Sequence, residues 1–397
     1  MTPGPWERFV AESAGAENAG YVERAGVGDR PGRAVWFRSP GSVLTLGPDA
    51  EAGDVRRSID RHLADHRWGA VVGYLGFDAV GLVEPALRRF PSGAPFPLGE
   101  LAFVPEARRG VVPPQRRRPL PRSRVGRPLA DSLPRPRFES SVRRLVRAIR
   151  DGEAFQVVLA HRRSWRRPED LLERGSLLRA AERYSTFYYL RFGDRELLGA
   201  SPESVAELHG RTAYIDPIAG TMPRDPRRRR RRGLRSDPKE LCEHRMLVDL
   251  ARNDLGTFAR AGSVRLAWTE RLVRYARLEH LVSRVAATVR PGTGPWDVLS
   301  AAFPAGTVSG APKIRATQLL RDEERSWRGP YAGAVALMEP GPRATFALAI
   351  RSAFASGDRL HTAAGAGIVH RSSPSREFGE TIAKLSAIET AVVGRGP

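Results

Sequence analysis

The stretch FESSVRRLVRAIRDGEAFQVVLA (residues 138–160) decides the fold class, because the spacing of its apolar residues is that of a helix in the first part and that of a strand in the second. Val142, Leu145 and Ile149 recur at helical spacing, which indicates an amphipathic helix over 138–150. Gly152 is a plausible stop signal for that helix, and residues 154–160 then form an apolar run typical of a strand. The stretch predicts a fold that mixes helices and strands.

The same patterns extend outward in both directions. They predict strands over 34–37, 42–46, 332–338, 345–352 and 361–364, a hairpin of 188–192 with 195–200, and helices over 58–66, 241–250, 279–288 and 376–392. Residues 69–78 are β-rich with closely spaced glycines. The predicted fold class is α/β (α+β) with many antiparallel strands.

A Pro/Arg-rich segment divides the chain. It contains VVPPQRRRPLPR (residues 111–122), which predicts no regular element, so residues 105–137 are interpreted as a linker or surface excursion. The predicted organisation is an N-terminal α/β portion over 1–104, this linker, and a catalytic region over 138–397.

Composition limits the class of protein. The chain has 397 residues, of which 41% are apolar and 27% charged, enough for a sizeable core. No apolar run reaches the length of about 18 residues that a membrane span needs. Cys242 is the single cysteine, and residues 1–9 lack a signal-peptide profile, so we expect a soluble protein of the cytoplasm that does not associate with membranes.

The formal net charge is +21, which attracts anionic partners. One alternative is therefore a nucleic-acid-binding protein that uses the run Arg227–Arg232, but no aromatic residues interleave that run to stack on bases. All basic residues except Lys239, Lys313 and Lys384 are arginines. A position that stays lysine against this bias indicates a need for a compact ammonium group, and we expect no nucleic-acid partner.

Two pairs of glutamates lie close to scarce lysines. Glu240 and Glu243 are three residues apart in a predicted helix, and so are Glu377 and Glu380, which Lys384 follows. Each pair shares a helix face, where two carboxylates repel one another unless a cation lies between them. Either pair alone is most simply a solvated acidic patch, but two such pairs are better explained by a shared Mg²⁺ site.

Two glycine-containing motifs complete the pattern. FPAGTVSGAPKIR (residues 303–315) opens a predicted helix with Lys313 in its first turns, where free backbone N–H groups bind anions. GAGIV (residues 365–369) follows a predicted strand. Taken singly, these motifs, Ser201-Pro-Glu203, His280 and Arg351 are most often structural.

In combination, the motifs resemble the chorismate-utilising enzymes, specifically the large subunit (component I) of anthranilate synthase. The resemblance is dense over residues 138–392 and includes FQVVL, SPE, PIAGT, KELCEH, RNDLG, GTVSGAPK, GAGIV and EFGETIAK in the family's order. It implies the chorismate-binding fold, with antiparallel sheets flanked by helices and the active site in the cleft between them.

The resemblance also implies residue roles. Glu203 is the acid that protonates the departing C4 hydroxyl, and His280 is tied to pyruvate elimination. Lys384 lies near the ring carboxylate and the metal. The implied Mg²⁺ ligands are Glu240, Glu243, Glu377 and Glu380. The implied substrate-binding residues are Gln156, Ala219, Gly220, Thr221, Thr307, Tyr331, Arg351, Gly365, Ala366 and Gly367.

Two positions discriminate within the family. Isochorismate-forming relatives carry a lysine, the base for water, where this chain has Gln156, so ammonia is the indicated nucleophile. Aminodeoxychorismate synthases carry a lysine that attacks C2 where this chain has Ala219, which has no nucleophile. The expected reaction is amination of chorismate at C2, followed by pyruvate elimination to anthranilate. Aminodeoxychorismate synthase component I remains an alternative.

A departure from the family keeps another alternative open. The Ser-His-Val-Met that usually precedes the histidine is Ala276-Arg-Leu-Glu279 here, so release of the intermediate, 2-amino-2-deoxyisochorismate, without pyruvate loss is possible. The N-terminal element of tryptophan feedback is not identifiable, which suits a secondary-metabolite pathway. The chain has no glutaminase motif, so we expect free ammonia or a separate glutamine amidotransferase subunit to supply nitrogen.

Overall fold

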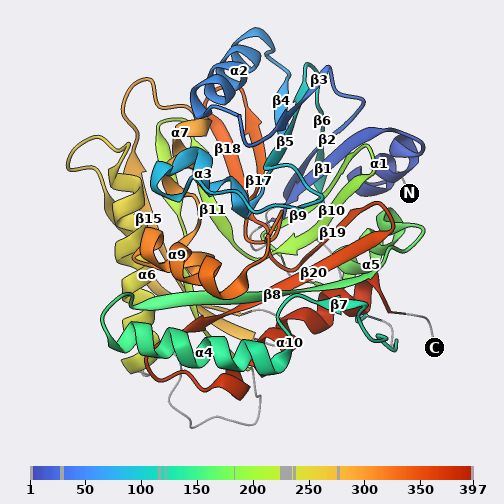
Figure 1. Cartoon of the computed structure of the whole chain (residues 1–397). Helices are drawn as coiled ribbons and strands as arrows, with labels where there is room; N and C mark the ends of the chain where they lie inside the picture. Colours follow the sequence, from blue (N-terminus) through green and yellow to red (C-terminus); the bar gives the residue numbers. More distant parts are fainter. Residues whose placement is uncertain are drawn as a thin grey trace.

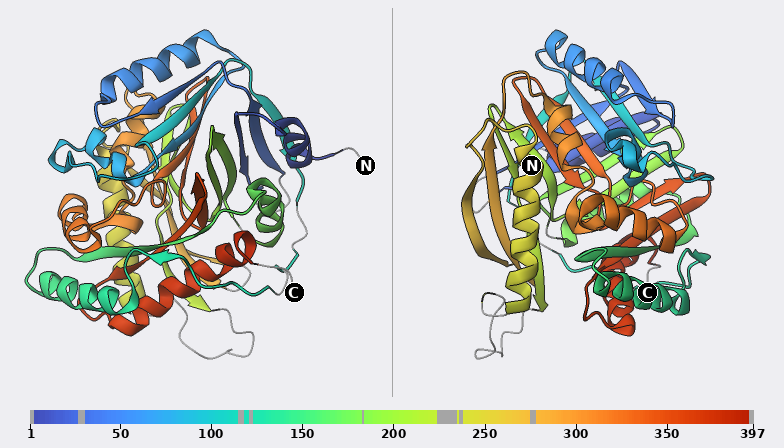
Figure 2. Two further views of the ribbon diagram at one scale, coloured as in Figure 1. Left: turned by 45° about the vertical axis from the view of Figure 1, so that its right-hand side comes forward. Right: turned by 60° about the vertical axis from the view of Figure 1, so that its left-hand side comes forward.

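The computed structural model describes residues 3–26, 31–114, 118–120, 123–182, 184–223, 235, 238–274 and 278–394. In this part of the chain, two large antiparallel sheets pack against each other and helices cover their outer sides (Figure 1). Figure 2 shows the same arrangement from two other directions. No helix among these residues is both long and apolar enough to cross a membrane.

The first sheet, sheet A, joins strands from both ends of the chain. Its order is β16-β8-β20-β19-β10-β9-β1-β2-β6, and β7 pairs with β8. The strands are β1 (Asn18–Arg24), β2 (Gly32–Arg38), β6 (Arg108–Val112), β7 (Ala130–Asp131), β8 (Gln156–Arg166), β9 (Thr186–Phe192), β10 (Arg195–Ser201), β16 (Gly310–Ala311), β19 (Ser352–Ser356) and β20 (Arg359–Ile368).

The second sheet, sheet B, has the order β13-β15-β12-β11-β18-β17-β4-β5-β3, and β14 pairs with β15. The strands are β3 (Ser42–Leu46), β4 (Ala70–Leu75), β5 (Gly99–Val104), β11 (Ser204–His209), β12 (Thr212–Ile215), β13 (Ile218–Pro223), β14 (Arg265–Arg274), β15 (Leu278–Thr288), β17 (Ala334–Glu339) and β18 (Arg343–Leu348).

Helices flank the sheets on separate sides. Helices α4, α5 and α10 pack together near sheet A, whereas α6 and α7 lie on sheet B (Figures 1 and 2). The helices are α1 (Pro5–Ser13), α2 (Ala52–Asp65), α3 (Val80–Val83), α4 (Arg135–Arg150), α5 (Leu171–Ala181), α6 (Pro238–Gly256), α7 (Pro295–Ala302), α8 (Gly306–Ser309), α9 (Lys313–Glu324) and α10 (Pro374–Val392), with short 3-10 turns η1 (Phe77–Ala79) and η2 (Pro85–Leu87).

Successive side chains of the strands in sheet A point to opposite faces of the sheet, so its apolar side chains enter two different hydrophobic cores. In β1, Val22 enters the large core between the sheets, whereas its neighbour Tyr21 enters a second core under α1, α5 and α10. This is the two-residue period of a strand with both faces covered. Sheet A is therefore buried on both sides, which gives the residues at its strand ends a rigid support.

Most predicted elements are confirmed. The helix over 138–150 is α4, and the strand over 154–160 begins β8. The hairpin of 188–192 with 195–200 is the antiparallel pair β9 and β10. The C-terminal prediction over 376–392 lies within α10.

The predicted helix over 279–288 is wrong, because these residues form strand β15. Leu281, Val282 and Val285 have a spacing that fits a helical stripe, but β15 pairs with β12, β13 and β14 and is buried on both faces. A strand covered on both faces loses the alternation of apolar and polar residues that identifies strands.

The segment 105–137 also differs from an irregular linker. It contains β6, which pairs with β2, and β7, which pairs with β8, and α4 begins at Arg135. Residues 1–104 contribute strands to both sheets, as do residues 138–397. In each sheet the N-terminal strands are grouped at one end and join the C-terminal strands at one pairing, β1 with β9 in sheet A and β4 with β17 in sheet B.

Candidate active site

Glu203 lies in the turn between β10 and β11, where Pro202 interrupts the strand. Thr307 of α8 donates a hydrogen bond from Oγ1 to Glu203 Oε1 at 2.6 Å. Burial raises the pKa of the Glu203 carboxyl to about 7, against the opposing effects of the Thr307 hydrogen bond and of the charges on Lys384 and Arg351. Glu203 is therefore substantially protonated near neutral pH, and it lies within electrostatic reach of two cations from other elements.

Lys384 connects α10 to strand β20. Its Nζ donates to the Gly365 carbonyl at 2.8 Å and pairs with Glu380 Oε1 at 2.8 Å. Nearly half of the Lys384 side chain is exposed, at 48%, so its ammonium is accessible as well as fixed. The structure thus places the Lys384 ammonium in contact with the backbone of the glycine motif at 365–369.

Two glycines of β20 are closely covered by side chains from other elements. A Cβ added to Gly367 would stand 2.3 Å from Gln156 Nε2, and one added to Gly365 would stand 3.2 Å from Tyr331 Oη. The intervening residue, Ala366, is fully buried. Gln156 and Tyr331 therefore lie against the β20 backbone, beside Gly367 and Gly365 respectively.

Gln156 begins β8 and keeps an unused hydrogen-bonding atom. Its Oε1 is buried and accepts no hydrogen bond from the described residues. A buried acceptor without a donor costs about 1–3 kcal/mol. This atom is a candidate acceptor for the N–H group of a small ligand.

Arg351 lies between β18 and β19 in the left-handed region, with φ of 49°. This conformation is uncommon outside glycine and is typical of functional positions. The nearest carboxylate is Glu182, whose Oε2 is 3.6 Å from Arg351 Nη1, longer than a charge-assisted hydrogen bond. The guanidinium is thus held loosely by the protein and remains suited to an anionic ligand.

Further predicted site residues lie on α6, β13 and β15, which pack against one another. Residues 219–221 (Ala219, Gly220, Thr221) lie in β13, and in its register Thr221 faces the buried His280 of β15; the side chains of 219–221 are outside the described part. His244 Nε2 lies 2.6 Å from Ser283 Oγ and joins α6 to β15. That contact fixes the face of α6 on which Glu240 and Glu243 lie.

The four glutamates lie as two pairs on two different helices, α6 and α10. Glu240 and Glu243 lie near the start of α6, and Glu377 and Glu380 near the start of α10, with Glu377 buried and Glu380 exposed. Both helices begin at the lower side of the molecule in Figure 1. Among the described residues, no three acidic, histidine or cysteine side chains are close enough to hold a metal ion by themselves. The donor atoms are carboxylate oxygens, which fit Mg²⁺ in kind.

The scarce lysines have different environments. Lys313 begins α9, as predicted, but its Nζ pairs with the buried Asp254 of α6 at 3.0 Å, so its charge is used inside the protein. The side chain of Lys239 and the run Arg227–Arg232 lie outside the described residues. Of the three lysines, Lys384 is the one that the structure shows within the site.

A supporting residue, Arg328, was not predicted. It is buried, pairs with Glu324 Oε1 at 2.5 Å, and donates to the carbonyls of Val308 at 2.7 Å and Val158 at 2.7 Å. It therefore ties the segment that carries Thr307 to strand β8. One arginine among many gives no sequence signal, because its role depends on burial.

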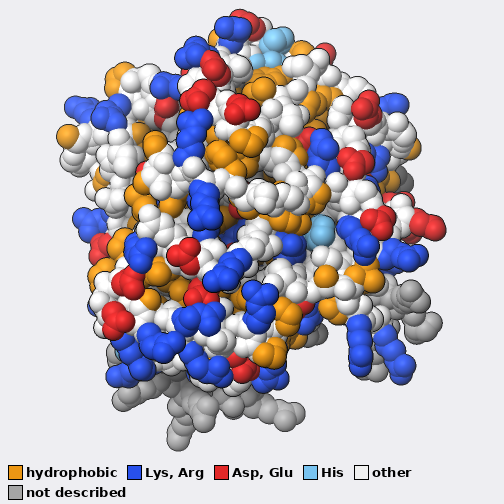
Figure 3. All heavy atoms as spheres, in the orientation of Figure 1, with side chains coloured by type: hydrophobic (Ala, Val, Ile, Leu, Met, Phe, Trp, Pro, Cys, Tyr) orange, Lys and Arg blue, Asp and Glu red, His pale blue; other side chains and the backbone are white. Residues whose placement is uncertain are grey.

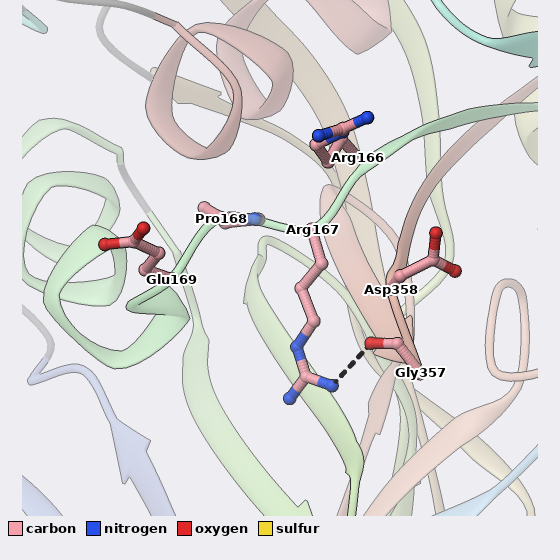
Figure 4. Close-up of a pocket in the computed structure, with 6 residues that line it drawn as sticks. All are labelled: Arg166, Arg167, Pro168, Glu169, Gly357 and Asp358. Atoms are coloured by element: carbon pink, nitrogen blue, oxygen red, sulfur yellow. Dashed lines mark hydrogen bonds between the residues drawn. The ribbon is translucent and has the colours of Figure 1, made fainter.

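A shallow surface pocket lies elsewhere, beside Arg166, Arg167 and Asp358 (Figure 4). Arg167 donates to the carbonyls of Gly357 at 3.0 Å and Asp194 at 2.7 Å, and it pairs with Glu196 at 2.6 Å. None of the predicted site residues lines this pocket. Because its central guanidinium is already satisfied, the pocket does not compete with the site around Glu203.

The fold and this site define a class of enzyme that binds chorismate. The chain belongs to that family, since the sequence profile described as chorismate binding enzyme matches residues 47–390.

Two named relatives from Streptomyces are similar to this chain. Anthranilate synthase component 1 of Streptomyces coelicolor is 37% identical over 374 residues, which cover 82% of this chain and 73% of that protein. The 2-amino-4-deoxychorismate synthase of Streptomyces globisporus is 40% identical over 260 residues, 65% of this chain and 53% of its own length. The chain thus spans about three quarters of the first relative and about half of the second.

Solved structures support the fold. Anthranilate synthase component I from Streptococcus pneumoniae superposes with a TM-score of 0.79 at 26% identity, covering 92% of this chain and 93% of that one. A putative 2,3-dihydroxybenzoate-specific isochorismate synthase from Bacillus anthracis gives a TM-score of 0.79 at 20% identity, covering 97% and 99%. At that identity, the second likeness shows the fold alone.

Proposed function

We propose that this chain aminates chorismate at C2 with ammonia, expels the C4 hydroxyl, and then eliminates pyruvate to give anthranilate. The observation that carries the proposal is Glu203, a carboxyl with a pKa near 7 that is bonded to Thr307 and lies within electrostatic reach of Lys384 and Arg351. Hydroxide is a poor leaving group, so the C4–O bond breaks readily when a general acid supplies a proton. The adjacent cations suit a substrate with two carboxylates.

Each side of the site has a separate task in this proposal. Arg351 and the Gly365–Gly367 backbone bind the enolpyruvyl carboxylate, and Tyr331 supports that strand. Lys384 lies toward the ring carboxylate. Residues Glu240, Glu243, Glu377 and Glu380 would hold Mg²⁺, which when bound supplies positive charge for the ring carboxylate.

Ammonia is the proposed nucleophile because of Gln156. An amide cannot act as the base that water requires, whereas its unpartnered Oε1 can accept an N–H group and orient ammonia. Attack forms the C2–N bond while the C4–O bond breaks, and the leaving oxygen takes the Glu203 proton to become water. The buried His280 is the proposed base for the later pyruvate elimination.

A second candidate is release of the aminated intermediate without pyruvate loss. The Streptomyces globisporus relative supports it, because its name describes chorismate with an amine at C2 and no oxygen at C4. The departure at 276–279 adjoins His280, and residues 276 and 277 lie outside the described part. Mass spectrometry after incubation with chorismate, Mg²⁺ and ammonium separates these products. Isochorismate or a 4-amino product as the main species would contradict both candidates.

The nitrogen source is part of the proposal. Relatives named component 1 suggest a second component, which we propose is a glutamine amidotransferase. The single cysteine, Cys242, is exposed on α6 and lies in no glutaminase motif. The isolated chain should therefore turn over chorismate with ammonium but not with glutamine. Glutamine-dependent turnover by the pure chain would contradict this proposal.

A further inference from the structure

A second cavity lies beyond Glu203. Its walls come from α6, the α7–α8 segment and the β11–β13 region of sheet B, and it encloses about 350 Å³ including its opening to solvent. Glu203 and Thr307 form part of the lining, whereas Lys384 and Arg351 do not. Glu203 thus borders this cavity, and the two cations that act on its pKa lie outside the lining.

The cavity follows one face of α6. Leu247, Leu250 and Ala251 line it, and Asp254 lies further along the same wall. Glu243 precedes Leu247 by four residues, so the helix face that carries the glutamate pair continues into the cavity wall. Ala302 and Ala305 form another wall, so most of the lining is apolar and small.

Two of the carboxylates in the cavity wall have cationic partners, and Glu203 has no direct ion pair among the described residues. Asp254 is neutralised by Lys313 at 3.0 Å, and Asp216 is bound by Arg284 through two hydrogen bonds of 2.7 and 2.6 Å. Burial raises the pKa of both aspartates, and these ion pairs oppose the rise. Glu203 has no direct ion pair among the described residues. It is therefore the wall carboxyl best placed to exchange a proton.

A cavity of this kind fits a short chain of water molecules. About 30 Å³ of it is open to the centres of water molecules, and one water needs roughly 10–15 Å³, so the space holds about two waters; each buried water needs about two to four polar partners. Glu203, Ser204, Asp216 and Asp254 present such partners along the wall. The apolar residues between these polar groups form no hydrogen bonds with water. The waters are therefore expected to bond to one another in a single row between the opening and Glu203.

We propose that this cavity is a water-filled proton inlet that reprotonates Glu203 from solvent after each turnover. The inference rests on the proposed function of Glu203 as general acid. Its proton leaves on the C4 oxygen as water, while the new C2 ammonium group releases one proton to solvent. The Glu203 carboxylate then takes one proton back through the cavity, so the proton count balances.

Filling the cavity tests the inference. Ala251→Leu and Ala302→Leu add bulk from different walls, and Ala301→Leu is the matched control, because Ala301 adjoins Ala302 in α7 but does not line the cavity. Below pH 7 the first turnover should proceed at the wild-type rate, because most of the Glu203 carboxyl starts protonated. Steady-state kcat should fall at least about tenfold with the KM for chorismate little changed, which gives a burst of one product per enzyme.

A purely structural role predicts a different result. It would slow the single-turnover rate and the steady-state rate in parallel, and that outcome overturns the inference, as does an unchanged kcat in both filled variants. Crystals of the wild-type chain give a readout independent of variant folding. Ordered waters between Glu203 and the opening support the inlet, whereas a dry cavity that binds xenon overturns it. Wild-type protein that fails to consume chorismate contradicts the proposed function instead.

Discussion

Glu203 combines two demands that ordinarily conflict. A general acid needs a proton at neutral pH, but nearby cations such as Lys384 and Arg351 favour the ionised carboxylate. In this structure the desolvation of Glu203 is the larger effect, and its pKa is raised to about 7 despite those charges. Without that desolvation the same two cations would leave the carboxyl with no proton to donate.

Replacing Glu203 by glutamine should remove most of the activity. Gln keeps the shape and can still accept the Thr307 hydrogen bond, but it has no acidic proton. We expect kcat for chorismate consumption to fall by roughly 100-fold to 10,000-fold, with a small change in KM. Thr307→Val is the control, because it retains the acid. Glu203→Gln activity within a few fold of wild type would show that another group is the acid.

The pH dependence of kcat should report the same group. Because Glu203 acts in its protonated form, kcat should fall as pH rises above about 7, and Thr307→Val should move this fall to higher pH, since loss of the hydrogen bond raises the pKa further. The rates must be compared at constant free ammonia, whose concentration also changes with pH. A fall that does not move in Thr307→Val would assign it to a different group.

Although Glu203→Gln should lose activity, its free energy of unfolding should rise relative to that of the wild type as pH increases. As pH rises from the ordinary Glu value of 4.5 toward 7, the unfolded chain loses the proton before the folded chain does, so wild-type stability falls over this range. The glutamine variant lacks this loss and should therefore gain stability relative to wild type with rising pH. Urea unfolding at pH 4.5 and pH 8 measures the difference, and a constant difference would contradict the raised pKa.

At the scale of elements, α10 is held by a buried contact in its middle. Thr381 Oγ1 lies 2.9 Å from Nε2 of the buried His161, whose Nδ1 is 2.9 Å from Asp131. Glu377, Glu380 and Lys384 lie within one turn of Thr381. The contact therefore fixes the position of the helix relative to strand β8, which begins with Gln156.

Thr381→Val should loosen that helix. It leaves His161 Nε2 without its partner, which destabilises the fold by about 1–3 kcal/mol in urea unfolding. The KM for chorismate should also rise, because Lys384 is carried by the same helix. Ser386→Ala, on the exposed face of α10, should change stability by less than about 0.5 kcal/mol. Equal effects of both substitutions would contradict a specific role for the buried contact.

Helices with one exposed face and most strands were predictable from the sequence, including the buried strand β17, but strand β15 was not. Helix α4 alternates buried and exposed positions at helical spacing, so its pattern identifies it. Strand β15 lies between other strands and α6, and its apolar residues fit a helix equally well. Motif residues such as Gln156 and Gly367 were recognisable by type, but Arg328 and the cavity behind Glu203 depend on contacts between distant segments.

At the scale of the whole molecule, the positive charge has a kinetic consequence. Lys and Arg side chains are spread over the face shown in Figure 3, and the formal net charge is +21. Such a field accelerates the arrival of an anionic substrate and is screened by salt. We expect kcat/KM for chorismate to fall between about 20 and 200 mM salt, while kcat at saturating chorismate stays constant. A parallel fall in kcat would indicate that salt damages the protein or its metal site instead.

The pairing of an N-terminal strand with a C-terminal strand in sheet B matters most while the chain is being synthesised. Strand β4 lies between β5 and β17 in sheet B, yet β17 begins at Ala334, more than two thirds of the way along the sequence. At about 5–20 residues per second, the ribosome leaves β4 without that neighbour for roughly 13–50 seconds. During this wait the nascent chain displays an apolar open edge, which is the kind of surface that aggregates or recruits a chaperone.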